Sequence, residues 1–110
     1  MKTLHLNLKK KWFDMILNGI KKEEYREMKP YWDNRLINQK LQTRYDVEGS
    51  DIAWKEYDTI TFSNGYSKNR KQMVVELKEI DIAKGNPEWG AVGDTVYYVL
   101  RLGNVLEINL

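Results

Sequence analysis

A short segment crowded with charges, residues 19–27, constrains the fold of this chain more than any other feature. It directly follows an amphipathic pattern with helical spacing and is itself typical of a β-strand. Successive side chains of a strand point to opposite faces, so Lys22, Glu24 and Arg26 share one face and Lys21 belongs to the other. The segment is therefore expected either as a solvated edge strand or as one wall of a cleft.

Changes in hydrophobic period predict roughly six strands and two helices along the chain. Leucines alternate with polar residues over 4–8, and helical spacing follows over 10–18, ending at Gly19. A second helix is predicted from Pro30 through about residue 38, with Leu41 continuing its apolar stripe. Further strands are predicted over 57–62, 72–82, 96–102 and 105–110, the last two forming a hairpin at Gly103-Asn104. Residues 42–56 show no sustained period and are expected to be irregular.

These elements favour a β-rich α+β fold. Mostly sequential, hairpin-linked strands are expected to curl into a small antiparallel β-barrel with two main helices. The 110 residues are expected to form a single domain, 1–110, around one modest core. A barrel of this size is expected as a monomer or a weak dimer.

Composition narrows the classes of function. The formal net charge of +2 offers no general electrostatic attraction for nucleic acid, so such binding must rest on local patches. The chain has no cysteine and one histidine, His5, which we expect to be structural; thiol chemistry is excluded, and no metal or cofactor is expected. No apolar run reaches the length of a signal peptide or membrane span, so a cytoplasmic protein without membrane contact is predicted.

Two loops add candidate binding residues. The turn Asn64-Gly65-Tyr66 is followed by basic residues that include Arg70, and basic residues interleaved with tyrosine suit single-stranded RNA. An ordinary hairpin loop with solubilising lysines is the commoner alternative. Trp89, in a loop rich in helix and strand breakers, is interpreted either as a plug of the barrel or as a stacking wall.

The residues around the charged segment resemble a known family. The stretches 6–8, 11–16 and 19–26 are similar to the ASCH domain of the PUA-like superfamily. In that domain a strand and a helix ending in Ile-x-x-Gly precede a strand with Lys-x-x-Glu-x-Arg, a spacing met here by Lys21, Glu24 and Arg26. The stretches 87–91 and 97–103 are also similar to bacterial and phage proteins of this type, so the resemblance covers nearly the whole chain outside 42–56.

The resemblance implies a PUA-like β-barrel whose charged strand lines a cleft beside the first helix and takes RNA, a nucleotide or a nucleoside. Lys21 and Glu24 have an odd spacing and cannot share a face of a regular strand. Lys21 is therefore expected in the turn after the helix or beside a bulge, with Lys22 as the rival assignment. The predicted ligand-binding residues are Lys21, Lys22, Glu24, Arg26, Asn64, Gly65, Tyr66, Arg70 and Trp89.

Two alternatives to a binding module stay open. In one branch of the family, the acetylcytidine amidohydrolases, a lysine activates a threonine three residues later and a glutamate from a later strand assists; another branch cleaves RNA. Lys21 and Glu76 match the lysine and the later glutamate, but Glu24 stands at the threonine position, which removes the hydroxyl nucleophile. A hydrolase acting on a modified nucleoside or RNA through Lys21 and Glu76 is one alternative, and a protein-interaction module is the other.

Overall fold

The computed structural model describes residues 2–38 and 52–110. Its helices are α1 (Lys10–Leu17), α2 (Pro30–Leu36) and a short 3₁₀ helix, η2 (Pro87–Trp89). Its strands are β1 (Thr3–Leu8), β2 (Glu23–Arg26), β3 (Thr59–Asn64), β4 (Lys71–Lys84) and β5 (Val96–Asn109). None of the helices in these two ranges is long and apolar enough to cross a membrane.

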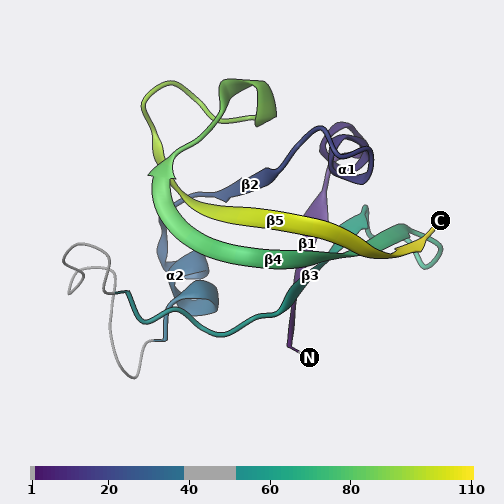
Figure 1. The fold of residues 1–110 in the computed structure, drawn as a ribbon, viewed down its shortest axis with the longest axis horizontal. Helices are drawn as coiled ribbons and strands as arrows, with labels where there is room; N and C mark the ends of the chain where they lie inside the picture. The colour runs from purple at the N-terminus through teal and green to yellow at the C-terminus, as the bar shows by residue number, and fades with distance from the viewer. Residues whose placement is uncertain (1, 39–51) are drawn as a thin grey trace.

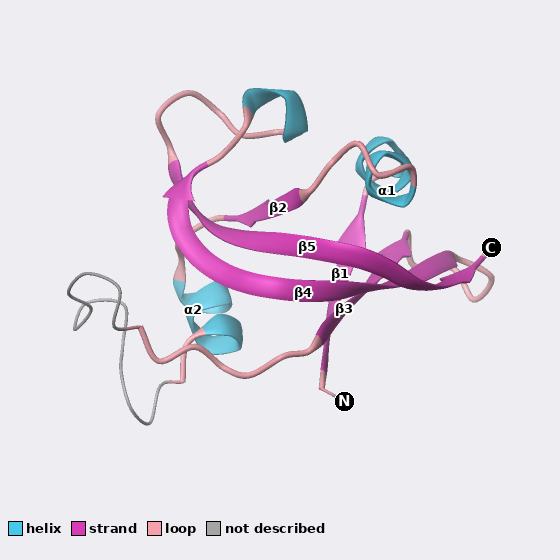
Figure 2. Ribbon diagram, viewed as in Figure 1, coloured by secondary structure: helices cyan, strands magenta, loops and turns pink. Residues whose placement is uncertain are grey.

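The strands form one curled sheet in the order β1-β3-β4-β5-β2, a half-barrel (Figure 1). The long strands β4 and β5 run antiparallel and bend together, and the helices lie at different ends of the curl (Figure 2). The expected barrel-like, β-rich fold is confirmed at this level. The expectation of a wholly antiparallel sheet is wrong for one pair, because β1 and β3 are parallel. The chain passes through α1, β2 and α2 between them, and parallel pairing requires such a long connection.

The predicted hairpin at Gly103-Asn104 is also wrong, because β5 continues unbroken through both residues. Its pairing with β4 shifts in register nearby, between Val75 and Leu77. A Cβ atom at position 103 would lie 1.9 Å from Oε1 of Glu76, so the glycine accommodates a close approach rather than a turn, and a side chain here would displace the Glu76 carboxylate. The backbone N–H of Asn104 donates to the same oxygen at 3.3 Å.

The first third of the chain follows its predicted pattern closely. The strand over the alternating leucines and the helix after it are confirmed, and Gly19 has the positive φ (74°) expected after a helix. The charged strand is shorter than predicted, because the N–H groups of Ile20 and Lys21 both donate to the carbonyl of Met15 and prolong the turn. The second helix ends at Leu36; Leu41 and residues 42–51 lie outside the described residues.

The core fills the concave face of the sheet. Phe13 and Ile16 of α1 and Leu36 of α2 are buried there against the apolar side chains of the strands. Alternation along β1 places Leu4, Leu6 and Leu8 in this core and leaves His5 exposed. The two helices therefore cover this main core, and a second, smaller cluster forms around Tyr25, Ala91, Tyr97 and Val99.

We expect Gly103→Ala to lower the free energy of unfolding by about 1–3 kcal/mol, because the new methyl group overlaps the Glu76 carboxylate. Urea unfolding of wild type, Gly103→Ala, Glu76→Ala and the double variant measures this. The double variant should lose less stability than the sum of the single variants, since removing the carboxylate makes room for the methyl group. Strictly additive losses would contradict this packing.

Candidate ligand-binding cleft

A cleft of about 1010 Å³ runs along β2 and reaches β1 and the β3–β4 turn. This volume lies at the upper end of the range of small-molecule sites. Its charged lining comprises Lys9, Arg26, Lys29 and Arg70 with Glu24 and Glu27, and its aromatic lining comprises Trp12, Tyr25, Tyr31, Trp32, Tyr66, Trp89 and Tyr97. The cleft therefore combines cationic and aromatic groups around a small number of carboxylates.

The charged residues of the motif meet at one side of this cleft, with Glu24 and Arg26 in its lining and Lys21 buried behind them. Lys21 Nζ lies 3.2 Å from Glu24 Oε1, and Arg26 Nη1 lies 3.4 Å from Glu24 Oε2. The side chain of Lys21 is 0% exposed and that of Glu24 is 6% exposed, so this is an ion pair taken out of water. Such a pair requires further polar partners to offset the loss of hydration. Lys21 has one, since its ammonium donates to the carbonyl oxygen of Trp89 at 2.5 Å.

Lys21 and Lys22 have different surroundings. Lys21 lies in the turn after α1, before β2 begins, and so approaches Glu24 despite the odd spacing. Lys22 is exposed and lines a second, smaller hollow of about 440 Å³ together with Trp89 and Arg101. Arg101 is held there by Glu23, Glu79 and Asp81. The structure thus groups Lys21 with Glu24 and separates Lys22 from them.

Glu24 has one satisfied and one unsatisfied carboxylate oxygen. Its Oε1 accepts from the backbone N–H of Tyr25 at 2.9 Å and faces Lys21. Its Oε2 is buried and has no hydrogen-bond partner among the described residues. Arg26 supplies positive charge near that oxygen but directs its hydrogen bonds elsewhere. A buried acceptor without a donor costs about 1–3 kcal/mol, so Glu24 has unused capacity to bind a donor.

Arg26 joins the two edges of the half-barrel. Its Nη1 donates to the carbonyl of Tyr25 at 2.7 Å and its Nη2 donates to the carbonyl of Asn7 at 3.3 Å. The guanidinium lies 5.2 Å from the ring centre of Trp32. Asn7 is on β1, so one side chain spans the opening between β2 and β1 where no strand pairing exists.

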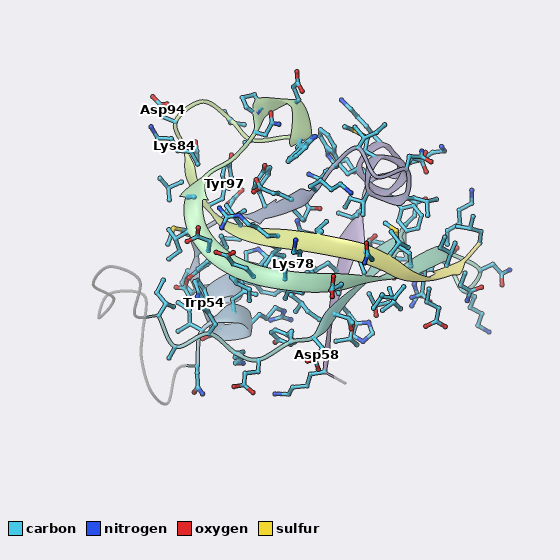
Figure 3. The ribbon with its side chains drawn as sticks, viewed as in Figure 1. Trp54, Asp58, Lys78, Lys84, Asp94 and Tyr97 are labelled. Carbon is cyan, nitrogen blue, oxygen red and sulfur yellow. The ribbon has the colours of Figure 1, made fainter. Side chains whose placement is uncertain are left out.

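The loop that carries Trp89 closes one end of the cleft. Lys84 and Asp94 approach to 3.5 Å near the two ends of this loop (Figure 3). Inside the loop, the N–H of Asn86 donates to the hydroxyl of Tyr25 at 2.8 Å. Gly90 has φ of 103° and passes so close to Trp12 that a Cβ would meet its ring at 3.1 Å. These contacts hold Trp89 beside Lys21.

The β3–β4 turn forms the other end of the cleft. Of the residues predicted here to bind a ligand, Gly65, Tyr66 and Arg70 line the cleft, whereas Asn64 does not and instead supports the turn from behind. The side-chain amide of Asn64 donates to the carbonyl of Leu8 at 3.1 Å, and the N–H of Gly65 donates to Asn7 Oδ1 at 2.9 Å. The turn is thereby fixed to the end of β1.

Sequence reasoning missed part of the lining and misplaced one residue. Trp12 and Trp32, on the apolar stripes of the two helices, are half-buried; they pack against the core and also line the cleft. Glu76 is absent from the lining, and its Oε1 accepts from Asn104 N–H on β5 instead. The structure therefore does not bring Glu76 to Lys21, and the pairing used for the hydrolase alternative has no contact to support it.

Burial changes the acid–base behaviour of two groups at this wall. Loss of hydration lowers the pKa of Lys21, although Glu24 opposes the change. Burial also raises the pKa of Tyr25 to about 12. Among the described residues, no three His, Asp or Glu side chains lie together as a metal site.

Comparisons of the chain with protein-family models, with curated proteins and with solved structures found no match.

The raised pKa of Tyr25 predicts a loss of stability in alkali. The unfolded chain releases this phenolic proton near pH 10.0, whereas the folded protein keeps it until about pH 12. The free energy of unfolding should therefore fall as the pH rises from 10 to 12. Denaturant titrations should show the stability difference between wild type and Tyr25→Phe shrinking over this range. A difference that stays constant with pH would contradict the assignment.

Proposed function

We propose that the chain is a nucleoside-binding module of the ASCH type, taking free nucleosides or nucleotides of RNA in the cleft along β2. One observation carries the proposal: Glu24 Oε2, a buried carboxylate oxygen in the cleft wall, has no hydrogen-bond donor among the described residues. This oxygen is closed off from solvent, so a ligand reaches it only when a neighbouring side chain such as Arg26, 3.4 Å away, moves aside. An N–H group brought to the oxygen then removes the cost of leaving it unsatisfied.

A nucleobase fits this requirement better than a phosphate does. Carboxylates accept hydrogen bonds from exocyclic amino groups, as glutamate does from cytosine N4. The anionic carboxylate repels a phosphate, which instead suits the cationic rim at Arg70, Lys9 and Lys29. The proposed pose therefore has the base at Glu24 and the sugar and phosphate toward the rim.

Aromatic rings supply stacking surfaces for such a base. Two rings already have a cation over one face: Lys21 Nζ lies 4.7 Å from the ring centre of Trp12, and the Arg26 guanidinium lies over Trp32. Among the described residues no cation lies over Trp89 or Tyr66, and both line the cleft. We assign base stacking to Trp89 and Tyr66, at the two ends of the cleft.

The likeness to the ASCH domain supports the same proposal. The spacing Lys21, Glu24 and Arg26 that carries the resemblance also brings these three side chains into contact. A curled half-barrel with a charged strand beside a cleft and close to the first helix is what the resemblance implies. Binding is favoured over hydrolysis because Glu24 replaces the threonine and Glu76 lies elsewhere.

We expect the purified protein to bind adenosine, cytidine and guanosine, measured by isothermal titration calorimetry, and to bind uridine most weakly. The only ring N–H of uracil lies between two carbonyl groups that a carboxylate repels. Glu24→Gln should weaken binding at least tenfold, since it removes the charge with little change of shape. Glu107→Gln, an exposed change of the same charge on β5, is the matched control.

Short single-stranded RNAs distinguish a free nucleoside from a nucleotide in a chain. Affinity that rises with length and falls with salt indicates RNA as the ligand, because backbone phosphates then contact the basic rim. Equal affinity for nucleoside and oligomer indicates a free nucleoside. Absence of binding by every nucleoside and oligomer would refute the proposal, and products from an acylated nucleoside would favour the hydrolase.

A further inference from the structure

Lys21 is completely buried and does not line the cleft. Its side chain is 0% exposed, and the cleft wall is formed by Glu24, Tyr25 and Trp89 in front of it. A ligand in the cleft therefore touches the partners of Lys21 rather than its ammonium group. This differs from the ligand contact or base that the sequence predicts for this residue.

The ammonium group of Lys21 joins three separate segments of the chain. It donates to the Trp89 carbonyl in η2 at 2.5 Å and lies 3.2 Å from Glu24 Oε1 on β2. It also lies 4.7 Å from the ring centre of Trp12 on α1 and 5.1 Å from that of Tyr25. The group that accepts the base and the ring that stacks on it are thus held by the same positive charge.

We propose that Lys21 is a positioning residue whose protonated side chain holds Glu24 and Trp89 in the geometry that binds the base, so that ligand affinity is lost when Lys21 loses its proton. This inference rests on the proposed function. The inference predicts that ligand affinity depends on pH, and it assigns this dependence to Lys21, which the ligand does not contact.

The neighbours of Lys21 set the direction of this dependence. Burial is the largest effect and lowers its pKa; Glu24 and Glu23 oppose that shift, and Arg26 adds to it. From α1 it meets the Trp12 ring, which also has Lys11 Nζ 4.6 Å from its centre, and from η2 it meets the Trp89 carbonyl. Tyr25, with a pKa of about 12, stays neutral meanwhile. Affinity therefore falls as the pH rises, and it falls at a lower pH than that at which an ordinary lysine loses its proton.

Loss of the proton weakens both attachments. A neutral amine offers fewer hydrogens and no charge, so the Trp89 carbonyl and the Glu24 carboxylate lose a charge-assisted hydrogen bond and an ion pair. Arg26, 3.4 Å from the other carboxylate oxygen, then remains the nearest cation to Glu24. We expect the carboxylate to turn toward Arg26, which occupies the oxygen that the base requires.

The test uses the absence of cysteine from the chain. In Lys21→Cys the single thiol is alkylated in denaturant with 2-bromoethylamine, which forms a C–S bond and releases bromide, and the protein is refolded. The product carries an amine on a side chain of lysine length in which sulfur replaces one methylene and lowers the basicity of the amine. Lys10→Cys, alkylated in the same way at an exposed position, is the matched control.

Cytidine and adenosine are the probes, because their bases do not titrate between pH 7 and 10.5. We expect Lys21→Met to weaken binding at least tenfold at pH 7 and the alkylated Lys21→Cys protein to restore it. Its affinity should fall at a lower pH than that of wild type, while the alkylated control follows wild type. Tryptophan emission of the ligand-free protein should change at the same pH as affinity, because positioning precedes binding.

The outcomes separate this inference from the proposed function. If wild type binds neither probe at pH 7, the proposed function fails and the inference fails with it. If wild type binds but the alkylated protein loses affinity at the same pH as wild type, the inference alone is overturned. If affinity falls as the pH rises while the tryptophan emission of ligand-free protein stays constant, Lys21 contacts the ligand directly. That result also overturns the inference. Thermal unfolding at each pH confirms that every protein measured is folded.

Discussion

The buried ammonium group of Lys21 is the interaction on which the cleft depends. A charge without access to water is tolerated only when polar partners surround it, and Lys21 finds them in the Glu24 carboxylate and the Trp89 carbonyl. These partners belong to β2 and to the loop between β4 and β5. The need to satisfy one buried charge therefore fixes the position of the loop relative to the strand, and the wall between them follows from that position.

The cleft exists because the half-barrel is not closed by strand pairing. Its edge strands β1 and β2 face an opening that Arg26 spans by donating to the Asn7 carbonyl. Polar and aromatic side chains line this opening in place of a ladder of backbone hydrogen bonds. The unpaired backbone groups of an edge strand can pair with another chain, and charged residues such as Glu24 and Arg26 disfavour that pairing. The same charges provide the recognition chemistry that we assign to the site.

Local patterns predicted the N-terminal elements well, because their contacts lie within a few residues. The alternation of Leu4, Leu6 and Leu8 and the glycine after α1 both follow from backbone geometry. The hairpin predicted at Gly103-Asn104 was wrong, because a Gly-Asn dipeptide suits either a tight turn or a strand that a side chain approaches closely. Glu76, distant in the sequence, decides between the two, and no local signal reveals its position. The place of Trp12 and Trp32 in the cleft lining was not predicted for a similar reason, since helical spacing shows which face is apolar but not everything which that face contacts.

The sequence by itself determined which residues share a face: Glu24 and Arg26 are in phase on a strand because side chains alternate every residue. It also indicated an anomaly at Lys21, whose spacing from Glu24 does not suit a regular strand. Only the tertiary structure decided that Lys21 turns inward, that Lys22 turns outward and that Trp89, 68 residues away, accepts its hydrogen bond. The physical reason is that local periodicity arises from backbone geometry, whereas a buried charge is stabilised by partners that the whole fold must bring to it.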